Sequence, residues 1–392
     1  MAKRNFWRNL TIIFGGVTGV MAGAALSPAL PGMAEHFQDL PNGEFLVRLS
    51  LTLPALFIAI TAPFVGGILD RTGRKPILIA SLVLFGIAGG AGYLIPTLSG
   101  ILISRAFVGI AVAGLVTGFT TLIADNFEGA ELNKYMGFQG AAMGIGGVLF
   151  LLLSGYLADI SWRLPFLMYP LAFAFLPGLL WAVDEPKLVR AASEQNSSKK
   201  QESFPLKSLL PIYILTALTI IIFFIFSIQL PFLLTADFGV SNSLVGLALA
   251  LQTLSSIFAA LLYRRLRERF SFAGILVLMF IALGINHAFT LFGGSYLAVV
   301  TGLLIGGIGL GLTPPNFNVW INSLVTDSQR GRALSGFTSA LFLGQFLTPI
   351  AVQLIDHRYG GRAVFSFGMW LSLVLVLLLM WWSRRENAAS PS

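Results

Sequence analysis

The stretch Gly66-Gly67-Ile68-Leu69-Asp70-Arg71-Thr72-Gly73-Arg74-Lys75-Pro76 is a short charged segment between two long apolar runs. It places one carboxylate, Asp70, among three cations. Gly66 has no Cβ and would let a neighbouring helix approach closely, and Gly73 would permit a tight chain reversal. Pro76 suits the first turn of a following helix. We therefore expect a charged turn between two helices here.

The composition around this turn is too apolar for a soluble protein. Hydrophobic residues make up 56% of the 392 residues and charged residues 11%, against roughly 25% charged residues in a soluble domain. A soluble fold leaves a large exterior facing water, so this much apolar surface requires lipid as the solvent. About twenty apolar residues cross the hydrocarbon core of a bilayer. The predicted spans are 9–30, 47–69, 76–95, 98–124, 136–158, 164–183, 208–231, 240–262, 272–293, 296–324, 333–355 and 361–382.

The spans fall into two groups of six on either side of a polar segment. We predict an N-terminal six-helix bundle at 1–183, a flexible cytoplasmic linker at 184–207 and a C-terminal six-helix bundle at 208–392. Gly137-Phe138 and Gly336-Phe337 open the fifth and eleventh spans 199 residues apart, and Arg163 and Arg362 repeat at the same offset. This favours an internal duplication, which is common in transporter folds. The expected fold is an all-α integral membrane protein with two similar halves.

Lysine and arginine residues concentrate on one side of this topology. With the N-terminus inside, Arg48, Arg163, Arg358 and Arg362 fall in outside loops, and Arg105 lies within a span. All the other Lys and Arg fall in inside loops, which sets the orientation by the positive-inside rule. We therefore expect a multi-pass protein of the inner (plasma) membrane with both termini in the cytoplasm. The net charge of +8 belongs to these loops and does not indicate a nucleic-acid partner.

The charged turn resembles the signature loop of the major facilitator superfamily, G-x-x-x-D-R-x-G-R-K. Every fixed position of that pattern is present: Gly66, Asp70, Arg71, Gly73, Arg74 and Lys75. The resemblance covers most of the chain and implies the major facilitator fold, with two six-helix bundles packed about a pseudo-twofold axis. It also implies a substrate site between the bundles and transport by alternating access.

Two further elements resemble the twelve-helix drug/proton antiporters of that superfamily. Arg105-Ala106-Phe107-Val108-Gly109 is similar to their R-x-x-x-G element, and Asp125 matches an acidic position that pairs in relatives with the loop arginine, here Arg74. The resemblance implies that Asp70, Arg74 and Asp125 form a charge relay that latches the halves when the cavity is open outward. The other fixed positions of the turn belong to the same predicted relay. Charge pairs at a moving interface make a switchable contact.

The fifth span is rich in glycine, including Gly140, Gly144, Gly147 and Gly155. The resemblance suggests the glycine-rich motif of the antiporters, but the Gly-Pro step of relatives is replaced here by Gly144-Ile145. Small residues also let membrane helices pack closely, which is the alternative interpretation. We expect these glycines, with Gly109 of the fourth span, at helix contacts.

Several polar residues lie inside predicted spans. Placing arginine in a spanning helix costs roughly 2.5–3.5 kcal/mol on insertion scales. Arg105 is therefore expected either to face a cavity, where it contacts substrate or a proton, or to extend to the outer interface. The other cavity candidates are Gln229, Gln252, Asn316, Asn318 and Gln345. The alternative for each is a hydrogen bond between helices.

Phenylalanines 223, 224 and 226 form an aromatic cluster in the seventh span. We interpret them as lipid-facing or packing residues, although aromatic side chains also line pockets for amphipathic ligands.

The sequence lacks the signatures of an enzyme or an ATP-driven pump. It has no cysteine, His36, His287 and His357 have no metal-like spacing, and no G-x-x-x-x-G-K-[ST] motif is present. We expect no enzymatic activity, no metal and no cofactor. None of the 17 Asp and Glu lies in the middle of a predicted span. Because an exporter of cations would place a carboxylate there, the cavity is predicted to favour neutral, zwitterionic or anionic substrates.

The preferred hypothesis is proton-coupled efflux of a small amphipathic drug or metabolite by a monomer, with substrate, protons and the lipid bilayer as its partners. One alternative is a facilitative or uptake carrier for a sugar or small organic acid, which fits the absent carboxylate. Its facilitative form predicts flux that is insensitive to the proton gradient. The other alternative is a non-transporting membrane sensor, which predicts no flux and a soluble partner bound to the linker.

Overall fold

Helices form every regular element in the part of the chain that the computed structural model describes, residues 2–185 and 204–389. The first half contains α1 (Ala2–Gly15), α2 (Val17–Ala24), η1 (Ser27–Ala29), α3 (Leu30–His36), α4 (Gly43–Thr72), α5 (Arg74–Ala91), α6 (Leu98–Asn126), α7 (Gly129–Ile160), η2 (Leu164–Phe175) and α8 (Leu176–Trp181), where η denotes a 3-10 helix. The second half contains α9 (Leu206–Phe238), α10 (Asn242–Arg267), α11 (Phe272–Phe292), α12 (Tyr296–Leu324), α13 (Asp327–Tyr359) and α14 (Gly361–Ala389).

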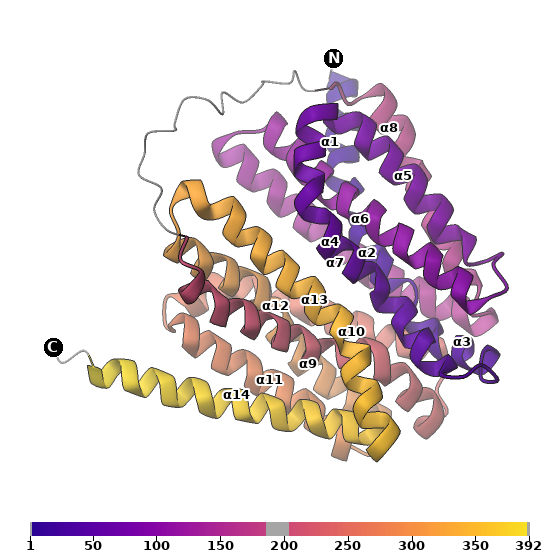
Figure 1. The fold of residues 1–392 in the computed structure, drawn as a ribbon, viewed down its shortest axis with the longest axis vertical. Coiled ribbons are helices and arrows are strands. Elements are labelled where there is room, and N and C mark those ends of the chain that lie inside the picture. Colours follow the sequence, from indigo (N-terminus) through magenta and orange to yellow (C-terminus); the bar gives the residue numbers. More distant parts are fainter. Residues whose placement is uncertain (1, 186–203, 390–392) are drawn as a thin grey trace.

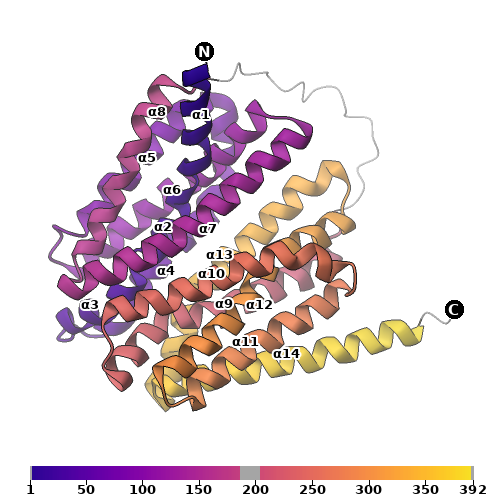
Figure 2. The same cartoon turned by 180° about the vertical axis from the view of Figure 1, so that it is seen from behind.

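The helices gather into two bundles, one from each half of the chain (Figure 1). The bundles converge near α3 and diverge toward the end that carries both termini, as the view from behind also shows (Figure 2). We call the converging end the α3 face and the opposite end the terminal face. Successive spans run in opposite directions, so the turn between α4 and α5 lies on the terminal face.

Twelve of the described helical segments are long and apolar enough to cross a membrane. They match the twelve predicted spans, six in each half, and confirm the all-α membrane fold. Most helices extend past the predicted apolar runs by several residues. For example, α4 begins at Gly43 and ends at Thr72, whereas the apolar run covers 47–69. The extra residues of α4 include Glu44, Asp70 and Arg71, whose charge ends the apolar run although the helix continues.

The first span is not the single helix that we predicted at 9–30. It extends over Lys3–His36 and is divided into α1, α2, η1 and α3. The first break follows Gly15, where a Cβ would lie 2.2 Å from the ring of Phe119 on α6. The second break contains Pro28, which cannot donate a backbone hydrogen bond. Close approach of α6 and the missing donor together interrupt the helix.

The sixth span also departs from a plain α-helix. Its first part, η2, is a 3-10 helix of 12 residues, and its last part is the short helix α8. Pro165 and Pro170 lie within η2. Because a proline removes the N–H donor and clashes with the carbonyl four residues earlier, it disfavours the α-helical pattern. The tighter 3-10 helix rises about 2.0 Å per residue rather than about 1.5 Å.

Each bundle has its own apolar core. Buried side chains such as Leu78, Phe119 and Tyr169 form one cluster in the first bundle. The second bundle holds two clusters, around Phe280 and Phe365. Across the interface α4 packs on α13 and α7 packs on α10. Most of the predicted linker lies outside the described residues, and the bundle boundaries remain a prediction.

Candidate functional site

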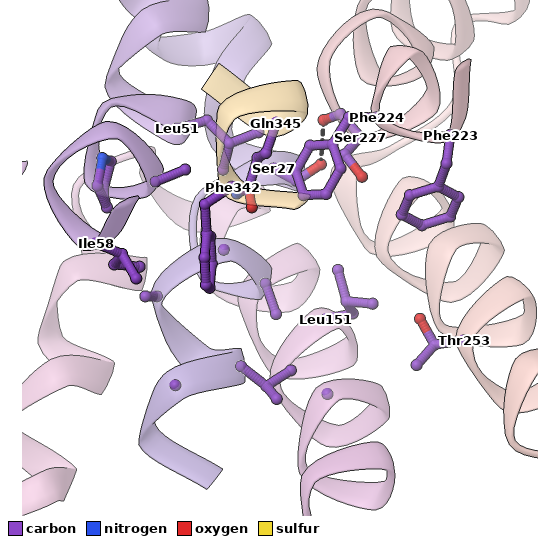
Figure 3. Close-up of a pocket in the computed structure, with 18 residues that line it drawn as sticks. Ser27, Leu51, Ile58, Leu151, Phe223, Phe224, Ser227, Thr253, Phe342 and Gln345 are labelled. Carbon is purple, nitrogen blue, oxygen red and sulfur yellow. Dashed lines mark hydrogen bonds between the residues drawn. The ribbon is translucent and has the colours of Figure 1, made fainter. Parts of the chain in front are cut away.

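A cavity of about 240 Å³ lies between the two bundles near the middle of the spans. Its lining comes from α2, η1, α4 and α7 of the first bundle and from α9, α10 and α13 of the second (Figure 3). The two main helix pairs that join the bundles, α4 with α13 and α7 with α10, both contribute to its wall. A small molecule in this cavity would contact both bundles at once.

The lining is mostly apolar, with a few hydroxyl and amide groups. The polar and aromatic lining residues are Ser27, Ser227, Thr253, Gln345, Phe223, Phe224 and Phe342. The Ser27 hydroxyl donates to the carbonyl oxygen of Ser227 at 2.5 Å, which ties η1 to α9 (Figure 3). No charged side chain is among the described residues that line the cavity.

The glutamines predicted for the cavity have different positions. Gln345 lines the cavity from α13. Gln229 and Gln252 are buried inside the second bundle instead. Within the described residues, Oε1 of Gln229 and Nε2 of Gln252 have no hydrogen-bond partner. Neither side chain contributes to the cavity lining, so the expected cavity position is not observed for these two.

The asparagines of α12 also lie outside the cavity lining. Asn316 is fully buried, donates to the carbonyl oxygen of Phe272 at 3.2 Å and lies 3.5 Å from the Tyr263 hydroxyl. Asn318 is half-buried on the same helix. Asn316 thus forms the helix-to-helix hydrogen bonds that were the alternative interpretation.

Two aromatic residues of α9 form part of the cavity wall. Phe223 and Phe224 line the cavity, although packing or contact with lipid was the prediction. Thr253 and Phe342 also line it and were not singled out. Their residue types fit a pocket, but the helices are apolar on all sides, so the sequence carries no signal for which side faces the cavity.

Arg105 lies inside the first bundle, and neither of its two expected positions is observed. Its side chain is 0% exposed. Nη1 donates to the Tyr169 hydroxyl at 2.7 Å and Nη2 to the carbonyl oxygen of Gly89 at 3.1 Å. The guanidinium also lies over the rings of Tyr169 and Phe166, at 4.6 Å and 5.2 Å from their centroids. A carbonyl dipole and two aromatic faces together stabilise a desolvated guanidinium.

Tyr169 connects Arg105 to the cavity wall through one further hydrogen bond. Tyr169 donates its hydroxyl hydrogen to the carbonyl oxygen of Ala22 at 3.0 Å. Ala22 lies on α2 and is one of the lining residues. The chain from Arg105 through Tyr169 therefore fixes the backbone of α2 where α2 borders the cavity.

Asp70, Arg74 and Asp125 come together on the terminal face. Nε of Arg74 lies 2.9 Å from the Asp125 carboxylate, and Nη2 lies 3.1 Å from Asp70. Nη1 donates to the carbonyl oxygen of Leu69 at 3.1 Å. All of these partners belong to the first bundle. Arg71 is exposed at the end of α4. Their role as a relay remains a prediction.

Glu185 completes this cluster, and the sequence analysis missed it. Its carboxylate accepts the backbone N–H groups of Arg74 at 2.6 Å and Lys75 at 2.9 Å, which are at the start of α5. A carboxylate at a helix N-terminus satisfies unpaired donors and complements the helix dipole. Gly73 has φ of 96°, and a Cβ there would lie 2.6 Å from Glu185. Glu185 had been assigned to the linker because it follows the last apolar residue of the sixth span.

Four of the predicted packing glycines lie in tight helix contacts. At each of them a Cβ would come within 2.4–3.0 Å of another helix. The pairs are Gly109 with Pro54, Gly144 with Ile257, Gly147 with Val20 and Gly155 with Asn242. Three of these four contacts involve α7, and two of those three join the bundles.

Gly66 and Gly140 are not in close contacts, contrary to the prediction. A Cβ on either residue would have no neighbour within 4 Å. Gly66 lies near the end of α4 and Gly140 near the start of α7, both toward the terminal face. The bundles diverge at this face (Figure 1), so no helix of the second bundle approaches these glycines in this conformation.

On the α3 face Arg48 joins the two bundles. Its Nη2 lies 2.6 Å from the Asp356 carboxylate on α13 and 2.6 Å from Glu44 on its own helix. Nη1 lies 3.4 Å from Oε1 of Gln353. Arg48 is 1% exposed, and the guanidinium lies over the ring of Phe232 on α9. We call this the Asp356 contact.

A second carboxylate joins the bundles on the same face. Asp159, at the end of α7, accepts the backbone N–H groups of Asn242 at 2.6 Å and Ser243 at 3.0 Å, and also the Ser243 hydroxyl. It therefore caps the N-terminus of α10. We call this the Asp159 contact. In both contacts the end of the fifth span of one bundle binds the start of the second span of the other.

Two membrane-spanning helix bundles around a cavity that both of them line are typical of a membrane transporter. The chain belongs to the Major Facilitator Superfamily, whose family model matches residues 12–227 and 212–392. This family consists of transporters.

Several relatives are resistance or efflux proteins. The chain is 28% identical to the tetracycline resistance protein, class B, of Escherichia coli over 337 residues, which cover 81% of this chain and 80% of the relative. It is 27% identical to multidrug resistance protein 1 of Bacillus subtilis (strain 168) over 391 residues, 97% of each chain. These relatives confirm the resemblance to the drug/proton antiporter group.

Solved structures show the same fold. A D-xylose-proton symporter superposes with a TM-score of 0.75 at 18% identity and covers 95% of this chain and 97% of that one. A POT family transporter superposes with a TM-score of 0.79 at 13% identity and covers 96% of each chain. At such identities the likeness concerns the fold alone, and it confirms the predicted major facilitator fold.

Proposed function

We propose that this protein exports small amphipathic compounds, a drug or a metabolite, by alternating access driven by proton entry. The observation that carries the proposal is the cavity between the bundles. Its wall combines three phenylalanines with three hydroxyl groups and one amide, and it holds no charged side chain among the described residues. Apolar and aromatic walls with a few polar groups are typical of sites for amphipathic ligands. The relatives named for resistance and multidrug efflux support the same direction of transport.

The uncharged wall defines the substrate class. A buried carboxylate would both attract an organic cation and titrate, and none lines the cavity. A neutral compound needs no counter-charge there. We therefore propose neutral substrates first and anionic or zwitterionic ones second.

We assign this conformation to the inward-open state. The distribution of Lys and Arg supports a cytoplasmic terminal face, and we propose that the protein acts as a monomer in the inner membrane. On that face Arg74 pairs within its own bundle, while the Asp356 and Asp159 contacts close the α3 face. In the proposed cycle the Arg74 cluster contacts the second bundle when the α3 face opens.

A carrier for a sugar or small organic acid remains the rival proposal. Ser27, Ser227 and Thr253 offer hydroxyl groups to a polyol, and Gln345 offers an amide. Against it, the Ser27 hydroxyl already donates to the backbone carbonyl oxygen of Ser227 at 2.5 Å, and three phenylalanines line the same wall.

Proton movement in inside-out vesicles tests the proposal. A pH-sensitive dye would report release of luminal protons as cationic, neutral and anionic amphiphiles are added in turn. We expect neutral compounds, and more weakly anionic ones, to release protons. A response to cations alone would contradict the proposed substrate class. Proton-independent flux of labelled sugars, with no response to the amphiphiles, would establish the rival.

The Asp70→Asn variant tests the predicted relay in the same vesicles. The Asp70 side chain is 71% exposed, and Asp125 continues to hold Arg74 at 2.9 Å. The variant should therefore fold and reach the membrane normally but lose flux, because the relay loses one of its anions. Flux equal to that of the wild type would show that Asp70 plays no part in the transport cycle.

A further inference from the structure

His287 is a titratable residue in the interior of the second bundle. It lies on α11 and is 0% exposed. Nε2 lies 3.2 Å from the carbonyl oxygen of Ile222 on α9. The imidazole centroid is 4.4 Å from the ring of Phe226 and 6.1 Å from that of Phe365. Nδ1 has no hydrogen-bond partner within the described residues.

The neighbouring residue, Asn286, adds unused hydrogen-bonding capacity at the same place. It is also 0% exposed, and neither its amide nitrogen nor its amide oxygen has a partner in the described chain. Leaving a buried polar group without a hydrogen-bond partner is unfavourable. Glycines make room for both side chains, since a Cβ on Gly306 would lie 2.2 Å from Asn286 and a Cβ on Gly368 2.2 Å from His287. Buried polar groups without partners need an explanation, and uptake of water or a proton at this place would provide one.

The position of His287 sets it apart from the other titratable residues. None of the 17 Asp and Glu lies in the middle of a span. His36 ends α3 and His357 lies in the last turn of α13, both at the α3 face. Histidine is the side chain that ordinarily changes charge near neutral pH. Among the described residues in the interior of the spans, His287 is therefore the histidine available to accept a coupling proton.

The first bundle contains a counterpart of this arrangement. There the Tyr169 hydroxyl binds the carbonyl oxygen of Ala22 on α2, and here His287 binds that of Ile222 on α9. At the offset of 199 residues, Tyr169 corresponds to Gly368, the residue that makes room for the imidazole. The first bundle adds the permanent charge of Arg105. The second bundle has an imidazole whose charge can change.

We propose that His287 binds the coupling proton and that its protonation moves α9, which borders the cavity; this rests on the proposed proton-coupled efflux. The residue after Ile222 is Phe223, which lines the cavity. An imidazolium among Phe226, Phe365 and Gly368 would be a desolvated charge without a carboxylate partner, which is strongly unfavourable. Proton binding therefore favours a conformation that admits water between α9, α11 and α14.

Among the described residues, no other charged side chain is in contact with His287. The contacts from α9 are Ile222 and Phe226, and those from α14 are Phe365 and Gly368. The charged residues at the outer ends of these two helices, Asp237 and Arg362, pair with each other at 2.9 Å on the α3 face. Substrate in the cavity and a proton on His287 would thus select different positions of α9, which gives exchange of one for the other.

The test compares His287→Gln with the matched control His36→Gln in proteoliposomes. His36 packs on Phe37 and Trp162 at the α3 face, away from the cavity. In the His287→Gln variant we expect substrate-induced proton release to fall about tenfold or more, since linkage requires a titratable group. Substrate counterflow, which needs no net proton movement, should stay within about twofold of the wild type because the cavity wall is intact. The control should match the wild type in both assays.

Two results would overturn the assignment. One is undiminished proton release by a folded His287→Gln protein. The other comes from a second measurement, in case that variant does not fold. In the His36→Gln/His357→Gln double variant His287 is the last histidine, and ring nitrogen NMR must show it changing protonation when substrate is added; an unchanged ring contradicts the proposal. A wild type that carries substrate without any proton movement would instead refute the proposed coupled efflux.

Discussion

At the scale of single residues, Tyr169 is the polar centre of the first bundle. It accepts a hydrogen bond from Arg105 and donates one to the carbonyl oxygen of Ala22. Its ring also faces the guanidinium at 4.6 Å. One hydroxyl group therefore serves both a buried cation and a buried backbone carbonyl, where water cannot replace it.

Replacing Tyr169 with Phe should lower the stability of the folded protein. The ring stays, but Nη1 of Arg105 and the carbonyl oxygen of Ala22 lose their partner. We expect a loss of about 1–3 kcal/mol, measured as a lower midpoint of thermal unfolding in detergent. The control is Tyr296→Phe, since Tyr296 donates to the carbonyl oxygen of Leu244 in an exposed position where water can take over. Equal shifts for the two variants would contradict this account.

The candidate site could be predicted from the sequence only in part. Asp70 and Arg74 were predictable from the dense charge pattern of the turn, and the resemblance to the superfamily placed Asp125 beside Arg74. The cavity residues were not predictable. Gln345 is the one amide among the predicted candidates that lines the cavity. Gln229 and Gln252 are equally polar and also lie within membrane-spanning helices. Only the packing of neighbouring helices decides which amide faces the cavity, and a helix that is apolar all round gives no sign of it.

At the scale of elements, the joint between α7 and α10 is the tightest contact between the bundles. A Cβ on Gly155 would lie 2.5 Å from the carbonyl oxygen of Asn242, and a Cβ on Gly246 would lie 2.4 Å from that of Leu151. Backbone meets backbone here, so neither helix can move aside by turning a side chain. Asp159 then caps α10 just beyond this crossing.

Gly155→Ala should shift the protein toward the state that is open at the α3 face. The added methyl group would push α10 away from α7 and stretch the Asp159 contact. Spin labels on the α3 ends of the two bundles would report a larger share of long distances. The matched control is Gly140→Ala on the same helix, where a Cβ meets nothing within 4 Å. A distance distribution for Gly155→Ala that equals the control would refute the prediction.

The positions of the spans were predictable, but their internal breaks were not. Apolar runs locate a span because lipid tolerates few charged side chains. The break at Gly15 depends on Phe119, which is more than a hundred residues away in the chain. The prolines of the sixth span were visible, but a proline in a membrane helix gives a kink as readily as a 3-10 segment.

At the scale of the whole molecule, the α3 face is held together by buried charge. Arg48 is 1% exposed, while the Asp356 side chain is 19% exposed. Removing one partner of a buried pair leaves the other uncompensated, which is strongly destabilising for the conformation that contains the pair. The Asp356 contact therefore favours the conformation in which the α3 face is closed.

Asp356→Asn should raise the population that is open at the α3 face about tenfold or more, because a charge-assisted bond contributes about 1.5–3 kcal/mol. Distances between spin labels on the α3 ends of the two bundles measure this population. The control is Asp237→Asn, which removes a carboxylate that pairs with Arg362 on the same face but within one bundle. The explanation fails if Asp237→Asn opens the face as much as Asp356→Asn does.

The two bundles and their shared fold were predictable, because the spans divide evenly and share an offset of 199 residues. The conformation was not predictable. One sequence must stabilise at least two arrangements of the bundles, and the pattern of apolar residues is common to both. The contacts that choose between them, such as Arg48 with Asp356, join residues more than three hundred positions apart.

The 3-10 helix η2 also matters for how the protein matches the thickness of a bilayer. The sixth span has 18 residues, which as an α-helix would measure roughly 27 Å, less than the ~30 Å hydrocarbon core. With 12 residues in η2 and 6 in α8, the span measures roughly 33 Å instead. The prolines thus lengthen a short segment without adding residues. Without these prolines, either the bilayer would have to thin around the sixth span or the polar ends of the span would enter the hydrocarbon.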